Sequence, residues 1–255
     1  MGKEFDWLKI NNKTGGVGEI YILGTITSEK WFDEDTTPKE ISGKIKELSN
    51  SSSVNIYINS PGGEVFAGMA IANMIKRINV PTYGYVEGIA ASIASVILLS
   101  CDKVVVPKNA YIMIHNASGV CVGTSKDMLE TVKLLDKLTN DIANIYAEKS
   151  GMKLEDVKTL MDDETWFNGE DAVSFGLADE LGDEKKIAAC LNGNEAIFND
   201  ISFNVEKFKT FPKEKLQLKN EIQKEILTED KENNLNFKLM IQKHEHLRNV
   251  LQNTI

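Results

Sequence analysis

The stretch Gly88-Ile89-Ala90-Ala91-Ser92-Ile93-Ala94-Ser95 joins two apolar segments through a run of small residues. Residues 80–86 before it are predicted to form a buried strand, and residues 90–99 a helix. Ser92 would stand near the start of that helix, with its oxygen close to the positive end of the helix dipole and to free backbone N–H groups. That position suits a catalytic nucleophile. It also suits an ordinary helix N-cap, and small residues there can reflect close packing alone.

The segments on either side of this stretch alternate between strand and helix patterns. In the longest predicted helix, residues 125–150, apolar side chains recur every three or four residues and form a stripe. Alternating strands and helices favour an α/β domain with a largely parallel sheet. Further strands are predicted at residues 19–24, 54–59, 103–107 and 110–115, and further helices at 65–75, 153–161, 169–175 and from Pro38 onward after a Thr37 cap.

The composition is that of a soluble globular protein, with 42% hydrophobic and 26% charged residues among 255. A net charge of −9 argues against a nucleic-acid binder. No apolar run reaches the roughly 18 residues that a membrane span needs, and the polar N-terminus lacks a signal-peptide core. The three cysteines are scattered without a CxxC pair, which fits free thiols and gives no zinc motif. We therefore expect a cytoplasmic protein with no cofactor, no metal, and neither nucleic acid nor a membrane as a partner.

The composition changes along the chain and predicts three parts. Residues 1–18 are predicted to be an irregular N-terminal segment, and residues 19–190 the folded domain. Residues 191–255, with a break at residues 192–194, are predicted to be an extension that is rich in Lys, Glu, Gln and Asn from Lys213 onward. Its interrupted helical spacing fits either a partly ordered, flexible extension or a pair of helices that acts in assembly, because helices this polar need a partner to bury their stripe.

A serine nucleophile needs a base, and the chain has three histidines from which to choose. His244 and His246 lie in the charged extension and are expected to be solvated. His115 ends an apolar strand, at the edge where open α/β sheets bind ligands. It is therefore the candidate base, and the alternative is a histidine that is merely packed and hydrogen-bonded in the core.

Two further motifs carry groups that a serine mechanism would use. Ser60-Pro61-Gly62-Gly63 ends a strand and opens a helix, so its glycines could present N–H donors to developing negative charge, or could form a simple Pro-Gly turn. It lacks the pattern of a phosphate-binding loop. The acidic run Asp162-Asp163-Glu164 could supply the carboxylate that orients a histidine, or could be helix-end charge. Adjacent carboxylates do not share a face, so this run gives no support to a two-carboxylate glycosidase.

Taken in order, these motifs resemble the proteolytic subunit of the Clp protease, the ClpP family. The matching stretches are residues 57–63, 88–92 and 113–115, and residues 171–179 are similar to the closing helix and strand of that family. The resemblance runs from about Glu19 to Leu181. It implies a ClpP/crotonase-like spiral of ββα units, with a mostly helical charged C-terminal extension added here. It also implies a homo-oligomer whose subunits form rings, with helix 125–150 contributing to contacts between subunits.

The same resemblance assigns roles to residues of this chain. Ser92 falls on the nucleophile of the family and His115 on its general base. The backbone N–H groups of Gly63 and Ile93 fall on its oxyanion hole.

Glu164 falls on the aspartate of the family, which leaves Asp163 as the alternative acid because a glutamate is one methylene longer. Ser95 lies one helical turn beyond Ser92, without a catalytic partner, and is predicted to be a packing serine.

Within the family, several phrases resemble the head maturation protease of tailed bacteriophages and prophages: residues 59–68, 114–116, 142–151 and 164–166. This resemblance implies a serine endopeptidase that processes capsid or scaffold proteins in the host cytoplasm. Three alternatives stay open: a housekeeping subunit that works under an ATP-driven Clp unfoldase, a crotonase-type acyl-CoA enzyme, and a non-catalytic assembly protein with the same fold.

Overall fold

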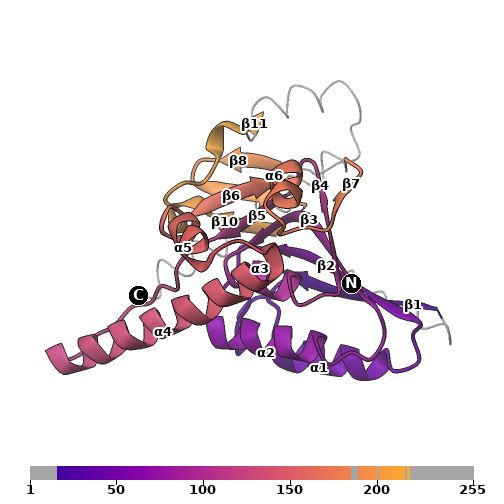
Figure 1. Cartoon of the computed structure of the whole chain (residues 1–255), viewed down its shortest axis with the longest axis horizontal. Coiled ribbons are helices and arrows are strands. Elements are labelled where there is room, and N and C mark those ends of the chain that lie inside the picture. The colour runs from indigo at the N-terminus through magenta and orange to yellow at the C-terminus, as the bar shows by residue number, and fades with distance from the viewer. Residues whose placement is uncertain (1–15, 185–188, 200, 216, 219–255) are drawn as a thin grey trace, which may run out of the picture.

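The computed structural model describes residues 16–184, 189–199, 201–215 and 217–218, which form two sheets and the helices around them (Figure 1). The larger sheet has seven strands, with β1-β2-β3-β4-β7 side by side and β5 and β6 continuing from β3. The smaller sheet has four, in the order β10-β9-β8-β11. The strands of the larger sheet are β1 (Val17–Leu23), β2 (Ser53–Ser60), β3 (Thr82–Ala91), β4 (Lys103–Pro107), β5 (Tyr111–Ile114), β6 (Thr165–Asn168) and β7 (Glu180–Gly182). The remaining elements are α1 (Pro38–Glu47), α2 (Val65–Ile75), α3 (Ile93–Leu98), α4 (Ser125–Ser150), α5 (Leu154–Asp162), α6 (Gly169–Ser174), β8 (Ala189–Asn192), β9 (Glu195–Phe198), β10 (Ile201–Asn204), β11 (Gln217–Leu218) and two short 3₁₀ turns, Val205–Lys207 and Lys213–Lys215.

The larger sheet is parallel at every pairing except β5 with β6, which confirms the predicted α/β class. Alternate residues of each strand point to the helices, so Ile20 and Ile22 of β1 join Ile41 of α1 and Ile71 of α2 in one core. Helix α1 begins at the predicted Thr37 cap, which forms a capping box with Glu40. In the part of the chain that the structure describes, no helix combines the length and the apolar character needed to cross a bilayer.

Strand β3 continues through the small-residue stretch, so the predicted helix start at Ala90 is wrong. Its first half pairs with β4 and its last residues, Ile89–Ala91, pair with β5. Ile89 and Ala91 are fully buried under the smaller sheet, while Ala90 packs into the main core. Here the small residues allow close packing on both faces of a strand, which leaves the helix to begin at Ile93.

The smaller sheet is formed by a part of the chain that is predicted from the sequence to belong to a mostly helical extension. Strand β8 runs across the predicted boundary at residue 190, and residues 195–198 and 201–204 form the strands β9 and β10. Their buried aromatic side chains pack against Ile89, Ala91 and Met113 of the larger sheet. The side chain of Asn59 also ties the two sheets together, because its Nδ2 donates to the carbonyl of Phe198 at 2.7 Å. The predicted helical spacing, together with His244 and His246, falls mostly beyond residue 218 and lies outside the described residues.

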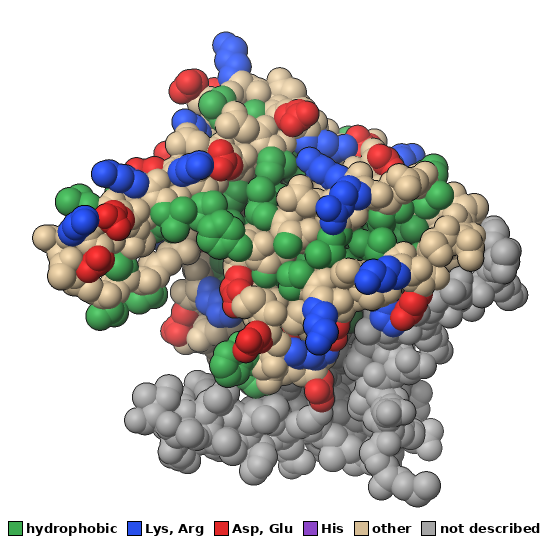
Figure 2. All heavy atoms as spheres, turned by 90° about the horizontal axis from the view of Figure 1, so that it is seen from below, with side chains coloured by type: hydrophobic (Ala, Val, Ile, Leu, Met, Phe, Trp, Pro, Cys, Tyr) green, Lys and Arg blue, Asp and Glu red, His purple; other side chains and the backbone are tan. Residues whose placement is uncertain are grey.

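Helix α4 has the predicted bounds but is buried over only part of its length. Its C-terminal half packs on the core through Ile142, Ala143 and Tyr146. Its N-terminal half projects from the body of the molecule, and Leu129 and Val132 are more than half exposed there (Figure 1). Figure 2 shows hydrophobic side chains on this projecting part, at the left of the view. The apolar stripe of α4 is therefore only partly used within the described part of one chain.

Candidate functional site

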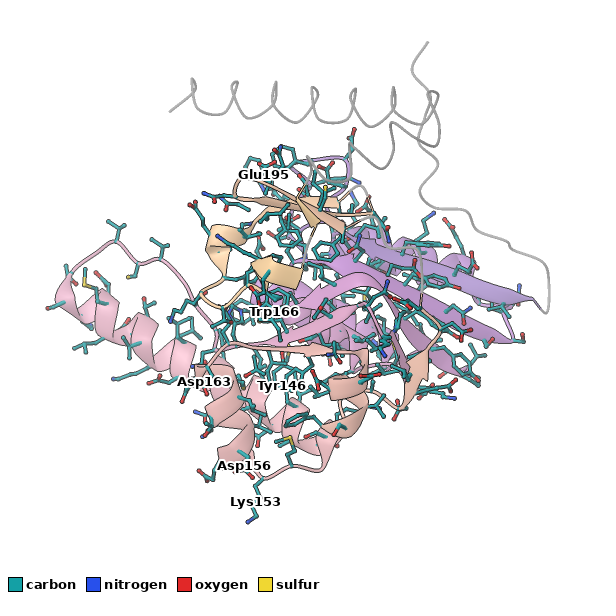
Figure 3. All side chains as sticks on the ribbon, turned by 90° about the horizontal axis from the view of Figure 1, so that it is seen from above. Tyr146, Lys153, Asp156, Asp163, Trp166 and Glu195 are labelled. Atoms are coloured by element: carbon teal, nitrogen blue, oxygen red, sulfur yellow. The ribbon has the colours of Figure 1, made fainter. Side chains whose placement is uncertain are left out.

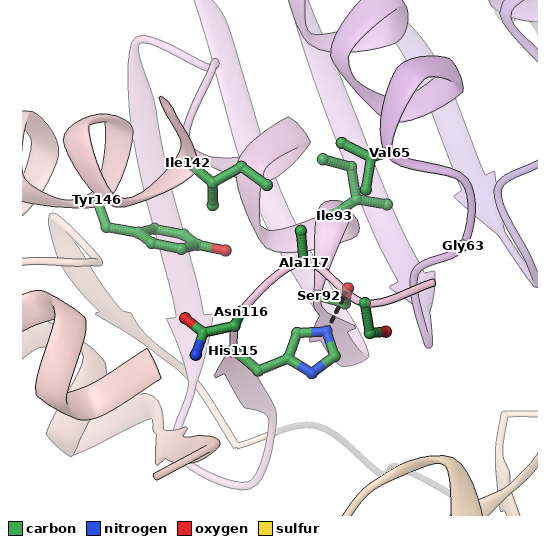
Figure 4. A pocket seen from close by; sticks show the side chains of 10 residues that line it. Gly63, Val65, Ser92, Ile93, His115, Asn116, Ala117, Ile142 and Tyr146 are labelled. Atoms are coloured by element: carbon green, nitrogen blue, oxygen red, sulfur yellow. Dashed lines mark hydrogen bonds between the residues drawn. The ribbon is translucent and has the colours of Figure 1, made fainter. Parts of the chain in front are cut away.

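Ser92 stands at a sharp turn between β3 and α3. Its backbone has φ 56° and ψ −129°, a conformation that side-chain-bearing residues rarely adopt and that costs about 1–3 kcal/mol. Its amide donates to the carbonyl of Met113 at 3.0 Å, while its side chain makes no capping hydrogen bond to α3. Ser92 is thus the N-cap residue of α3 by position, but its side chain does not cap the helix. The turn instead directs the hydroxyl into a pocket on the surface (Figure 4).

His115 meets that hydroxyl. Its Nε2 lies 2.8 Å from Ser92 Oγ, the hydrogen bond drawn in Figure 4. The contact follows from the sheet, since Ala91 pairs with Met113 and the residues after these two strand ends are brought together. Burial lowers the pKa of His115 below its usual range, an effect that Glu164 opposes and Lys209 reinforces. The imidazole is therefore held in its neutral form near pH 7, in which it can accept a proton.

Glu164 is the acid that the structure brings to His115. Its Oε2 lies 3.8 Å from His115 Nδ1, and its side chain is only 6% exposed. Strand β6 pairs with β5 through Thr165 and Ile114, which places the preceding glutamate beside the histidine. Asp163, the predicted alternative acid, is the C-cap residue of helix α5 and is exposed (Figure 3). In the described part of the chain, the carboxylate that contacts His115 is that of Glu164.

The Gly62-Gly63 turn presents a backbone amide to the same pocket. Ile26 donates to the carbonyl of Gly62 at 2.9 Å and accepts from the amide of Glu64 at 2.8 Å. Because this parallel bridge uses the groups on either side of Gly63, the N–H of Gly63 points away from Ile26. Gly63 lines the pocket beside Ser92.

The second predicted donor, Ile93, is the first residue of α3 and also lines the pocket. An amide in the first turn of a helix has no partner four residues back, so it is oriented to bind a ligand atom. Both residues predicted to supply these amides therefore line the pocket together with Ser92 and His115. Two N–H groups beside a nucleophile and a base are the arrangement that stabilises an oxyanion.

The pocket has an apolar side next to the nucleophile. Val65 of α2, Ile142 and Tyr146 of α4 line it together with Ala117 (Figure 4). An apolar side chain of a bound peptide would be accommodated there, next to the reacting groups.

Ser95 lies one turn beyond Ser92 and is fully buried. Its hydroxyl contacts the carbonyl oxygen of Ser92 at 2.6 Å and the hydroxyl of Tyr146 at 2.7 Å. Burial raises the pKa of Tyr146, so this phenol remains protonated and hydrogen-bonded. Ser95 therefore links α3 to α4 and does not face the pocket.

Replacing Ser95 with alanine is expected to lower the free energy of unfolding by about 1–3 kcal/mol, because a buried phenol loses its partner. Labelling of Ser92 by a fluorophosphonate should persist. Chemical denaturation and mass-spectrometric mapping of the label would measure the two effects. Ser100→Ala is the matched control, since among the described residues the Ser100 hydroxyl bonds only the carbonyl of Ile97 in the preceding helix α3. Loss of the label at Ser92 in a folded Ser95→Ala protein would contradict this structural role.

The sequence analysis missed Thr210. Its amide donates to Glu164 Oε1 at 2.8 Å, and its hydroxyl contacts the same oxygen at 3.1 Å and the backbone carbonyl of Glu164. The neighbouring Phe208 and Phe211 are buried against Trp166. Two aromatic residues within a lysine-rich segment were the one signal that this stretch packs on the domain.

Comparison with known proteins relates most of the chain to one family. The sequence model of the Clp protease family matches residues 33–185. The ATP-dependent Clp protease proteolytic subunit 1 of Chlamydia abortus is 32% identical, over 68% of this chain and 94% of its own length. The proteolytic subunit 2 of Treponema denticola is 33% identical, over 58% of this chain and 78% of its own. Among solved structures, a mutant of ClpP1 from Listeria monocytogenes superposes with a TM-score of 0.57 at 25% identity, covering 66% of this chain and 92% of that one.

Proposed function

This chain belongs to the Clp protease family as a serine-type peptidase with a ClpP-like fold, and we propose that Ser92, His115 and Glu164 are its catalytic triad. The observation that carries the assignment is the 2.8 Å contact between Ser92 Oγ and His115 Nε2, made by a serine whose strained backbone turns its hydroxyl into the pocket. A hydroxyl held in this way beside a neutral imidazole is an activated nucleophile. Mapping a fluorophosphonate adduct to Ser92 tests the assignment.

The proposed mechanism uses the triad and the two backbone amides in the arrangement described above. Ser92 Oγ attacks the peptide carbonyl carbon while its proton passes to His115 Nε2. The amides of Gly63 and Ile93 bind the negative oxygen of the tetrahedral intermediate. His115 then protonates the leaving amine, which leaves an acyl-enzyme that water hydrolyses with His115 again as the base. The Glu164 carboxylate stabilises the imidazolium that forms in each half of the reaction.

The pH dependence of this mechanism has a definite direction. The base must be neutral, and burial lowers the pKa of His115 from the ordinary value of 6.5 although Glu164 partly offsets this. The neutral form therefore persists to a lower pH than in a free histidine, and activity is lost only as the pH falls below the lowered pKa. We expect the acidic limb of a kcat/KM profile to have its midpoint below pH 6.5. A midpoint above that value would contradict the buried-base assignment.

We further propose that the substrates are capsid or scaffold proteins, cleaved without ATP during the assembly of a phage or prophage head. Support comes from the resemblance of residues 59–68 and 142–151 to that branch of the family and from the added sheet beyond the matched residues 33–185. The exposed apolar half of α4 supports assembly into a homo-oligomeric ring, because an unpaired apolar stripe of this kind favours contact with another subunit.

A second candidate is the proteolytic subunit of an ATP-dependent Clp protease. The names of the Chlamydia and Treponema relatives favour it. One assay separates the candidates: the purified chain is incubated with a separately purified capsid or scaffold protein, with and without ATP and a Clp unfoldase. Cleavage without ATP supports the processing peptidase, and cleavage only with ATP and the unfoldase supports the second candidate. An inactive Ser92→Ala chain is the control for contaminating peptidases.

A further inference from the structure

The segment Phe208–Phe211, here termed the strap, passes beside Glu164, the proposed acid of the triad. It lies between β10 and β11 of the smaller sheet and beyond residues 33–185, the part of the chain that the family model matches. Phe208 and Phe211 are each 7% exposed and meet Trp166 edge-on, with ring centroids 5.2 and 5.1 Å away. The ring of Phe208 also lies 6.5 Å from that of His115. These contacts hold the strap against Trp166, which lies two residues after Glu164 in the sequence.

Thr210 stands between the two buried phenylalanines and reaches Glu164 with two groups. The amide donates to Oε1 at 2.8 Å, and the hydroxyl lies 3.1 Å from the same oxygen and contacts the Glu164 carbonyl as well. One carboxylate oxygen is thereby held by Thr210, which leaves Oε2 to face His115 Nδ1 at 3.8 Å. Thr210 therefore orients the carboxylate through Oε1, and Oε2 is the oxygen that faces the histidine.

Glu164 needs such a restraint. A glutamate side chain has several rotatable bonds, and holding it in one geometry costs conformational entropy. A carboxylate that is 6% exposed must also find donors within the protein. The backbone of Glu164 has φ 50°, a left-handed conformation that surrounding contacts have to maintain. The contacts from Thr210 meet all three needs.

We propose that Thr210 is a positioning residue for the acid of the triad, so that the strap is a working part of the catalytic site. The inference rests on the proposed function, because it assigns Thr210 to a reaction carried out by Ser92, His115 and Glu164. Thr210 touches neither the nucleophile nor a reacting atom, and it acts through Glu164 alone.

Thr210→Val in the full chain removes the hydroxyl and keeps the amide and the side-chain shape. Thr210 is exposed, so the substitution loses little packing. We expect fluorophosphonate labelling of Ser92 to slow by roughly tenfold, the rate equivalent of the one hydrogen bond that the hydroxyl proton can donate to Glu164, and Thr210→Ser to restore it. Thr159→Val is the matched control, because Thr159 is exposed on α5 and its hydroxyl, within the described part of the chain, bonds only the carbonyl of Glu155 in the same helix.

Two further readouts separate positioning from a general loss of structure. The groups that act on the charge of His115 are Glu164, which raises its pKa, and Lys209, which lowers it. If the Glu164 carboxylate turns away from His115, it no longer raises the pKa of that histidine. The acidic limb of the pH profile of the labelling rate should therefore move to lower pH in Thr210→Val. In a Glu164→Ala background, Thr210→Val should cause no additional slowing.

Equal labelling rates in wild type and Thr210→Val would overturn the inference. So would an undiminished effect of Thr210→Val in the Glu164→Ala background, because the threonine would then act through some other group. Absence of any label on Ser92 in the wild-type chain would overturn the proposed function and this inference together. The two failures are therefore distinguishable.

Discussion

Replacing Ser92 with alanine is expected to abolish peptide-bond cleavage, with a loss of about 10⁶-fold in kcat as for other serine nucleophiles removed from a triad. The reason is geometric, since Ser92 Oγ is the hydroxyl within 2.8 Å of His115 Nε2. Ser95, one turn away, is committed to Tyr146 and faces the protein interior. Cleavage of a protein substrate and fluorophosphonate labelling, both followed by mass spectrometry, measure the effect.

The stability of the same variants provides the control. Alanine, like serine, carries a Cβ, so the backbone strain at φ 56° is the same in both proteins. Ser92→Ala should therefore unfold at nearly the wild-type temperature. Glycine adopts positive φ without penalty, so Ser92→Gly should be inactive yet more stable, by about 1 kcal/mol or more. Undiminished cleavage by a folded Ser92→Ala protein would remove this residue as the nucleophile.

Replacing Gly63 with alanine is expected to damage both the site and the fold. A Cβ built at Gly63 would lie 2.1 Å from the carbonyl oxygen of Ile26, and φ is +153°. The backbone must therefore move, which displaces the amide proposed to bind the oxyanion. Loss of one such donor costs about 10²- to 10³-fold in kcat. The strain should also lower the free energy of unfolding by about 1–3 kcal/mol.

Gly43 offers a matched control for this substitution. It lies exposed in helix α1, and a Cβ there meets nothing within 4 Å. Gly43→Ala should keep full activity and stabilise the protein by about 0.5–1 kcal/mol, because alanine favours the helix. Steady-state kinetics and thermal unfolding of both variants give the comparison. A Gly63→Ala protein with wild-type kcat would show that this amide does not bind the oxyanion.

Much of the candidate site could be predicted because its main residues lie directly after the ends of strands. Ser92 and His115 each follow a strand, and strands that alternate with helices place such ends along one edge of a sheet. The choice between Asp163 and Glu164 could not be made from the sequence. It depends on where β6 pairs with β5, and a shift of one residue would exchange the inward and outward acids.

Other parts were missed because their signals are weak or distant. Residues 90–91 have no periodicity, so a strand buried on both faces was predicted as the start of a helix. Strands β8 to β10 have four residues each, too few to show a clear alternation. The contact of Thr210 with Glu164 spans 46 positions of sequence, and a threonine between charged and aromatic residues does not reveal its partner.

The burial of β3 on both faces has a consequence for the order of synthesis. A chain emerging from the ribosome exposes Ile89, Ala91 and Met113 long before the residues that cover them, which begin at Ala189. Until then this apolar face is open to solvent, and such surfaces bind chaperones or aggregate. Ser92 and His115 are also synthesised well before Thr210, which holds their acid. If Thr210 positions Glu164 as proposed, the catalytic site is complete only when nearly all of the described chain has been made.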